Sequence, residues 1–182
     1  MKKAEVLEMR KKATALYEKA HIVMSKDELE NIEIADLGLN EFEKTGLAIV
    51  TYINTEFYCG KEMAMLPFQT CPEHTHKPMP EIGYMGKQET FRCRYGKVYL
   101  YIAGEKTENP HCKPPKGSED CYTVWHEIVL NPGEQFTIKP DTLHWFQADK
   151  DGAIVSEFST TSHDEYDIFT DKRIKREPTE EE

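Results

Sequence analysis

The sequence predicts an all-β domain with helices at its N-terminus. From Gly46 onward the chain is a series of short β-branched and aromatic runs, each bounded by Gly, Pro, Asn or Asp, and such a series is typical of a barrel or sandwich. The first part of the chain instead carries apolar side chains at helical spacing between Lys, Arg and Glu. At 182 residues the chain is long enough for one well-buried domain and too short for two. We therefore expect a single domain over residues 1–182.

Residues 1–45 form the expected helical extension. An apolar stripe predicts a surface helix over residues 2–20. Ser25 and Glu28 have the Ser-x-x-Glu form of a capping box, so a second, short helix is expected to begin there. The apolar residues of this helix, as far as Ile34, would pack inward.

Residues 46–160 form the expected barrel. The runs predict strands over residues 47–53, 58–66, 89–95, 97–103, 122–130, 135–138, 144–148 and 153–159. Gly and Pro residues between 103 and 120 predict a long excursion. An excursion of this length could serve as a lid, as a contact between subunits, or as a passive extension of a hairpin. Residues 161–182 form a C-terminal segment that ends in an acidic tail. The segment is expected to fold back across the barrel and place a side chain at the mouth of the barrel.

Composition excludes several classes of partner. The formal net charge of -10 argues against binding nucleic acid, which requires a concentrated basic surface. No apolar run approaches the roughly 20 residues that cross a bilayer, and the N-terminus is charged where a signal peptide would be apolar. The cysteines form no Cys-x-x-Cys pair and fit reduced thiols. We expect a cytoplasmic protein that does not interact with membranes.

The stretch around His74 carries a metal-binding pattern. In an extended backbone alternate side chains share a face, so His74 and His76 can direct two imidazoles at one point. In the next strand-like run Lys87 and Glu89 share a face by the same alternation. His144, which begins another strand after a Pro turn, completes a set of three histidines and one carboxylate. This donor set suits Mn²⁺, Fe²⁺, Co²⁺, Ni²⁺ or Zn²⁺.

Two segments resemble the motifs of the cupin superfamily: the His-x-His pair followed by Glu89, and a Gly...Pro...His run that ends at His144. The usual first motif has its Glu closer to the second His, and Glu81 lies nearer that offset than Glu89 does. Pro and Gly around Glu81 favour a turn, whereas Glu89 lies in a strand-like run, so we assign the fourth ligand to Glu89. The resemblance implies the double-stranded β-helix, or jelly-roll barrel, of the cupins.

Longer stretches resemble the small D-lyxose isomerases of this superfamily. They lie at residues 91–101, 122–127, 142–147 and 155–159, within a similarity that runs from about 46 to 176. The resemblance implies a metal-dependent aldose-ketose isomerase that interconverts D-lyxose and D-xylulose, and also D-mannose and D-fructose, through a metal-stabilised enediolate. It further implies a homodimer, with Mn²⁺ as the expected cation.

Lys87 and Glu157 are the candidates for proton transfer beside the metal. Lys87 should enter the cavity that Glu89 faces, and the Lys-x-Glu pairing resembles the isomerase family, although a surface lysine at a strand start fits the residues equally well. Glu157 lies in an otherwise apolar strand, where a carboxylate must be paired, metal-facing or solvated at an edge. We expect Glu157 to act as the base and Lys87 as its electrophilic or proton-relaying partner. A hydride shift between the sugar carbons is the alternative mechanism.

Two other functions would use the same fold. Cupin oxygenases and oxidases hold iron or manganese with three His and one Glu, and they would consume oxygen. A sugar-binding or metal-binding cupin would keep the ligands and tolerate the loss of Lys87 and Glu157. The sequence has no Gly-rich phosphate loop, which favours a free sugar over a sugar phosphate. Cys71 would offer a thiolate to zinc in a further alternative, but its strand parity is opposite to that of the histidines and favours a buried structural role.

Overall fold

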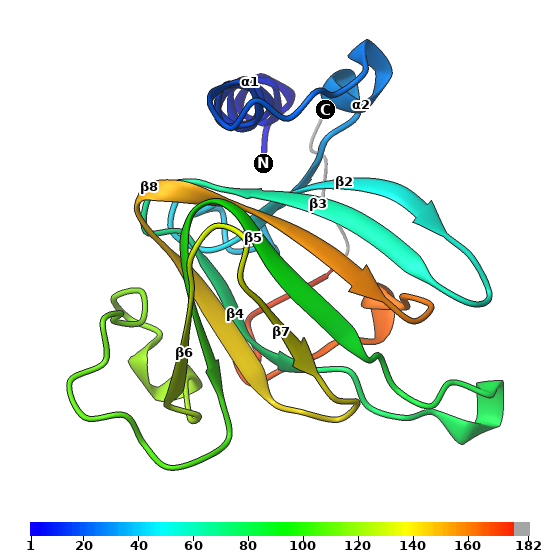
Figure 1. Ribbon diagram of the computed structural model, residues 1–182, viewed down its shortest axis with the longest axis vertical. Helices are drawn as coiled ribbons and strands as arrows, with labels where there is room; N and C mark the ends of the chain where they lie inside the picture. The colour runs from blue at the N-terminus through cyan, green and yellow to red at the C-terminus, as the bar shows by residue number, and fades with distance from the viewer. Residues whose placement is uncertain (177–182) are drawn as a thin grey trace.

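Figure 1 shows the computed structural model, which describes residues 1–176, as a strongly curled sheet with the N-terminal helices on one side. The described α-helices are α1 (Lys3–Lys19) and α2 (Lys26–Glu30). The described strands are β1 (Glu33–Ala35), β2 (Leu47–Asn54), β3 (Cys59–Met65), β4 (Thr70–Thr75), β5 (Glu89–Ile102), β6 (His126–Leu130), β7 (Gln135–Ile138), β8 (His144–Ser159) and β9 (Ile168–Phe169). Short 3₁₀ turns lie in the connections: η1 (Pro80–Ile82), η2 (Glu119–Cys121) and η3 (Asp164–Tyr166). The predicted all-β class with N-terminal helices is confirmed.

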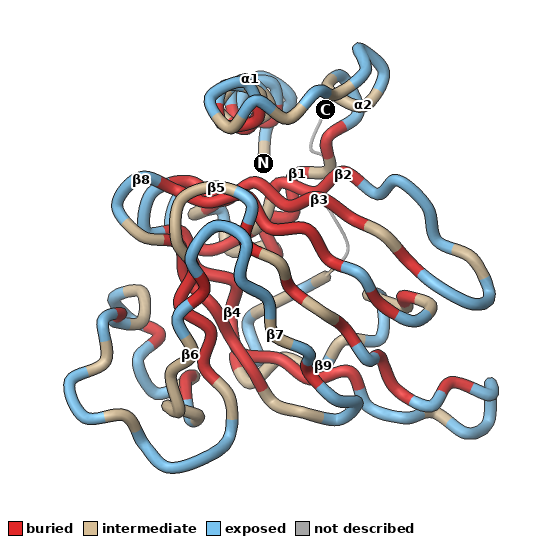
Figure 2. Tube along the Cα trace, viewed as in Figure 1, coloured by how far each residue is buried: buried red, intermediate tan, exposed pale blue. Residues whose placement is uncertain are grey.

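The sheet closes around β8. Along one path the strand order is β1-β2-β3-β8-β4-β9, and β5 pairs with β6, β7 and β8. Because β8 bonds to β3, β4 and β5, the halves of the sheet face each other across an apolar core. Figure 2 shows that burial follows these strands, whereas the loops and the outer sides of the helices are exposed. Core side chains include Ile49, Met63, Phe91, Phe146 and Val155.

Strands β5 and β8 are longer than the sequence predicted. The expected pairs of strands, 89–95 with 97–103 and 144–148 with 153–159, each form one continuous strand. The register shifts near Gly96, whose φ is +71°. A Cβ on Gly96 would lie 2.0 Å from the carbonyl oxygen of Gly152. The glycines that predicted a chain break instead allow the paired strands to bend sharply and continue.

The N-terminal elements cover the outer face of the sheet next to β2 and β3. Helix α1 buries Met9, Ala13 and Tyr17, as its apolar stripe predicted. Helix α2 begins at the predicted capping box, in which Ser25 accepts a hydrogen bond from the Glu28 amide. It ends before Ile34, contrary to prediction, because Ile34 pairs with Ala48 in β1 and packs under α1. For a β-branched residue such as Ile34, buried pairing in a strand is more favourable than lengthening a helix of five residues.

The excursion after β5 packs against the barrel through aromatic side chains. The strand predicted over 122–130 begins only at His126, because Tyr122 packs edge-on against Trp145 and the amides of Thr123 and Val124 donate to the carboxylate of Glu73. Buried Glu73 also accepts a hydrogen bond from Thr170 Oγ1 at 2.7 Å. One carboxylate on β4 therefore fastens both the end of the excursion and the C-terminal segment.

The C-terminal segment folds back across the barrel, as predicted. Strand β9 pairs with β4, and η3 lies just before it. The acidic tail predicted at the end of the chain, residues 178–182, lies outside the described residues. Within the described residues, every helix is too short or too polar to cross a bilayer.

Candidate metal centre

Three histidines meet at one end of the barrel. His74 and His76 alternate along β4, and His144 at the start of β8 is the register partner of His74. All three side chains are buried, and their ligand nitrogens lie within 4.8 Å of one another. The parity argument therefore placed His74 and His76 correctly on one face, and the turn before β8 brings His144 to them.

Each imidazole is held through its Nδ1 atom by a hydrogen-bond acceptor. His74 Nδ1 lies 2.8 Å from the Pro72 carbonyl oxygen, and His144 Nδ1 lies 2.9 Å from the Thr142 carbonyl oxygen. His76 Nδ1 contacts the carboxylate of Asp167, which the C-terminal segment supplies. An acceptor at Nδ1 places the ring proton there and leaves the lone pair on Nε2, the form that binds a cation.

Glu89 completes the set of donors. Its Oε1 lies 3.2 Å from His76 Nε2 and 3.1 Å from His144 Nε2. All three of these atoms are buried and have no hydrogen-bond partner among the described residues. Buried polar atoms that converge without partners are costly unless a cation satisfies them. Glu81 is exposed on η1, so the structure brings Glu89 rather than Glu81 to the histidines.

The electrostatics of these residues suit a cation. Burial and the neighbouring His144 and His76 lower the pKa of His74 well below its ordinary value, which keeps that ring neutral. Burial alone would raise the pKa of Glu89, but Lys87 and His76 outweigh it and hold the pKa well below its ordinary value. His74 and Glu89 are therefore in the forms that bind a cation, neutral imidazole and ionised carboxylate. At His76 burial would lower the pKa, but Glu89 and Asp167 outweigh it and raise the pKa to about 9, so a cation that binds there displaces a proton.

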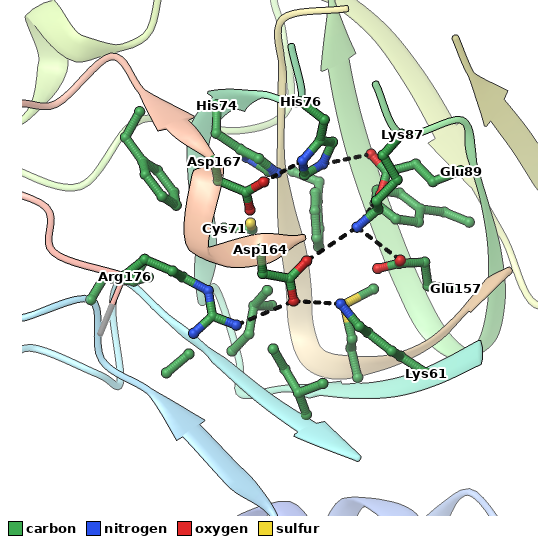
Figure 3. Close-up of a pocket in the computed structure, with 18 residues that line it drawn as sticks. Lys61, Cys71, His74, His76, Lys87, Glu89, Glu157, Asp164, Asp167 and Arg176 are labelled. Atoms are coloured by element: carbon green, nitrogen blue, oxygen red, sulfur yellow. Dashed lines mark hydrogen bonds and ion pairs between the residues drawn. The ribbon is translucent and has the colours of Figure 1, made fainter. Parts of the chain in front are cut away.

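Lys87 and Glu157 lie beside Glu89 and the histidines (Figure 3). Lys87 Nζ is 3.1 Å from Glu89 Oε2 and 2.9 Å from Glu157 Oε1. Lys87 is therefore a buried side chain of the cavity and not a surface lysine. Glu157, on β8, is also buried and accepts a hydrogen bond from Ser159 Oγ at 2.9 Å. Of the three environments considered for Glu157, which were paired, metal-facing and solvated at an edge, the structure shows the paired one.

The ion pairs continue outward through residues that the sequence analysis did not single out. Asp164 Oδ1 lies 3.6 Å from Lys87 Nζ, and Asp164 Oδ2 lies 2.5 Å from Lys61 Nζ. Arg176 Nη2 lies 3.3 Å from Asp164 Oδ2. Lys61 could have been found from the sequence, because it is a lone cation in the middle of a predicted buried strand. Asp164, Asp167 and Arg176 lack such a signal, since no periodicity links them to the barrel.

The cavity between these groups is polar on one side and apolar on the other. Its apolar wall includes Leu47, Ile49, Met63 and Phe169. Cys71 also lines it, and burial raises the pKa of this thiol well above its ordinary value. Cys71 therefore stays a neutral thiol, buried as expected. The parity argument was wrong about its direction, because the register of β4 on β8 shifts between Cys71 and His74 and brings Cys71 to the same cavity as the histidines.

Comparisons with known proteins agree on one family. A sequence model of the D-lyxose isomerase family matches residues 9–182. The D-lyxose/D-mannose isomerase of Thermosediminibacter oceani is 64% identical over 178 residues, which cover 98% of this chain and 97% of that protein. The D-lyxose ketol-isomerase of Cohnella laeviribosi is 54% identical, with the same coverage of 98% and 97%.

Solved structures give the same fold at lower identity. L-ribose isomerase from Cellulomonas parahominis without ligand superposes with a TM-score of 0.75 at 17% identity, over 96% of this chain and 94% of that one. The Acinetobacter sp. DL28 enzyme in complex with L-ribose has a TM-score of 0.75, again at 17% identity and with coverage of 96% and 94%. The barrel of this chain is thus the cupin-type barrel implied by its motifs.

Proposed function

Because the chain belongs to the D-lyxose isomerase family and is an aldose-ketose isomerase, we propose that it interconverts D-lyxose and D-xylulose, and D-mannose and D-fructose. The observation that carries this proposal is the convergence of buried, unpartnered His and Glu atoms beside a buried Lys-Glu ion pair. The family is one of isomerases and not of oxygenases or of cupins that only bind sugars.

His74, His76, Glu89 and His144 would hold one divalent cation, and Mn²⁺ is the ion we propose. Mixed imidazole and carboxylate donors suit this ion and its neighbours in the transition series. Such a cation supplies a Lewis acid that polarises the sugar carbonyl and the adjacent hydroxyl. The hydrogen bonds to the three Nδ1 atoms fix the rings for this purpose.

Glu157 would move the proton between the sugar carbons. It would take the proton from C2 of the aldose and return it to C1, while the proton on O2 passes to O1. Lys87 lies 2.9 Å from Glu157 and is also in contact with Glu89, so it would stay charged between the two carboxylates. A charged Lys87 would donate a hydrogen bond to the oxygen on which negative charge develops. In this proposal Glu157 is the base and Lys87 its electrophilic partner.

The cellular setting and the assembly are also proposals. The cysteines of the described chain are free thiols, which supports a reducing, cytoplasmic compartment. A homodimer is supported by exposed apolar side chains that line one outer groove, namely Val23, Tyr52 and Phe158.

The first experiment measures conversion of D-lyxose to D-xylulose by EDTA-treated protein with and without added Mn²⁺, with D-mannose and glucose 6-phosphate in parallel. We expect turnover that requires the metal and is greatest with D-lyxose. Metal-bound protein without turnover of any of these sugars would contradict the proposal. Deuterium from solvent should appear in the product if Glu157 transfers a proton, and its absence would favour a hydride shift.

A further inference from the structure

The cavity beside the three histidines is narrow in this structure. The space open to the centre of a water molecule is about 40 Å³, and one water needs about 10–15 Å³ on this scale, so the cavity has room for about three waters. A pentose carries an oxygen on every carbon and needs more room than this. Given the isomerase function proposed above, on which this inference rests, part of the wall must move to admit the substrate.

Lys61, Asp164 and Arg176 form part of the wall between the cavity and the surface. They line the cavity, and they also line an outer groove of about 390 Å³ together with Glu33 and Asn54. Exposure decreases across this wall: the side chain of Asp164 is 21% exposed and that of Arg176 16%, whereas Lys61 is 5% exposed. Figure 3 shows Asp164 between Lys61 and Arg176, and the ion pairs of these three residues lie where the cavity and the groove share their lining.

The part of the wall that carries Asp164 lies outside the strands of the sheet. The polar side chains opposite Asp164 are those of Lys61, Glu89 and Glu157, which lie on the paired strands β3, β5 and β8. Asp164 instead lies on η3, where the amides of Tyr166 and Asp167 bond within the segment itself. The segment is fastened immediately on either side of η3. Ser162 exchanges two hydrogen bonds with the side chain of Asn54, and the carboxylate of Asp167 holds His76 Nδ1. Such a short turn between two fixed points can move without breaking a strand pair.

We propose that Asp164 is the latch of a gate, formed with Lys61 and Arg176, through which free sugars pass from the outer groove to the metal centre. When the latch opens, Asp164 leaves Lys61, Lys87 and Arg176, and the sugar enters beside Lys61 and Arg176. When it closes, the carboxylate returns to Lys61 and excludes bulk water from the reacting carbons. Asp164 is in this role a positioning residue, since it acts on access and not on the reacting atoms.

Cys71 provides a reporter of the gate, because its buried thiol lines the cavity. We would measure iodoacetamide labelling of individual cysteines by peptide mapping in the Mn²⁺-loaded protein, without sugar, for the wild type and Asp164→Asn. Cys93 is an internal control, since it is also buried in the apolar core but does not line the cavity. Glu165→Gln is the matched variant, because it removes an exposed carboxylate from the same turn on the side of the groove.

We expect Cys71 labelling to accelerate about tenfold or more in Asp164→Asn, because removing one partner of a buried ion pair is strongly unfavourable to the closed form. Cys93 labelling should not change, and Glu165→Gln should behave as the wild type. Arg176→Gln, which weakens the other side of the latch, should accelerate Cys71 labelling in the same direction.

Unchanged Cys71 labelling in Asp164→Asn and Arg176→Gln would overturn the gate. Equal acceleration of Cys71 and Cys93 would also overturn it, because the whole fold would then have loosened. Labelling does not depend on turnover, so this result is separate from the proposed activity. Protection of Cys71 by D-lyxose in the wild type tests whether the sugar occupies the cavity.

Discussion

At Lys87, one buried ammonium is shared by the carboxylates of Glu89, Glu157 and Asp164. A buried charge of this kind is tolerated only when its partners are placed accurately around it. Burial alone would lower the pKa of Lys87, but Glu157 and Glu89 outweigh it and raise the pKa well above the ordinary value. The lysine therefore serves as a fixed positive charge and hydrogen-bond donor.

Glu157→Gln tests the base. We expect kcat for D-lyxose to fall by about 10²–10⁴-fold, the usual contribution of a general base. Bound Mn²⁺, measured by elemental analysis, should be unchanged because Glu157 lies outside the set of ligands. A variant that keeps full turnover would remove Glu157 from the reaction.

Asp167→Asn tests the support of His76. The amide cannot offer the charged acceptor that holds His76 Nδ1, so Mn²⁺ affinity should fall by about 10–100-fold. Titration against a competing chelator measures this affinity. Asp171→Asn is the matched control, because Asp171 lies on the same segment and bonds to Arg173 instead. Equal losses in both variants would mean that the segment, and not the hydrogen bond to His76, had been disturbed.

The residues predicted from sequence were those governed by short-range geometry. Alternation along an extended chain placed His74 beside His76, and Lys87 beside Glu89, on shared faces. Asp164 and Asp167 could not be predicted in this way, because they come from a segment without regular periodicity. Their positions depend on where a long connection crosses the barrel, which only the closed fold determines.

At the scale of elements, β5 and β8 each bend near Gly96 and Gly152 and continue, so that both halves of each strand belong to one sheet. Sequence reasoning read the glycines there as ends of strands, since a glycine that permits a turn also permits a bulge. The helix at the N-terminus and its capping box were predictable because both signals are local. The start of β6 was not predictable from the sequence, because it depends on the contact between Tyr122 and Trp145, which are far apart along the chain.

Gly96→Ala tests the bend. A Cβ there would lie 2.0 Å from the Gly152 carbonyl oxygen, in addition to the strain of a φ of +71°. We expect the free energy of unfolding to fall by about 3 kcal/mol or more in urea denaturation. Gly117→Ala is the control, because its φ is +89° but nothing lies within 4 Å of its Cβ, and it should cost only about 1–2 kcal/mol. Equal costs would show that the contact with Gly152 relaxes freely.

At the scale of the whole molecule, stability should depend on pH through Asp164. Burial alone would raise the pKa of this carboxyl, but Lys87 and Lys61 outweigh it and hold the pKa well below its ordinary value. A depressed carboxyl pKa stabilises the fold above the unfolded value of about 3.9 and loses that contribution as pH falls toward the folded value. The difference in unfolding free energy between wild type and Asp164→Asn should thus be constant near neutral pH and shrink below about pH 3.9. A difference that does not change with pH would contradict this assignment.

The homodimer is testable at the outer groove that Val23, Tyr52 and Phe158 line. Phe158, 54% exposed, would bury its ring against a second copy. Phe158→Glu should weaken dimerisation by about tenfold or more, because a charge would be desolvated in the interface, and light scattering after gel filtration measures the mass. Phe68→Glu is the control, because Phe68 is also exposed but lines a different groove, and this variant should keep the mass of the dimer. An unaltered dimer in the Phe158 variant would place the interface elsewhere.

The position of Asp164, Asp167 and Arg176 after β8 also bears on synthesis. Strand β8, which closes the sheet, and the segment after it are translated after the other long strands of the barrel. Until then a nascent chain holds β4 with two histidines and neither His144 nor Asp167. Chains that stall before these residues would lack both a closed barrel and a complete set of ligands, so an unfinished chain should neither capture the metal nor turn over sugar.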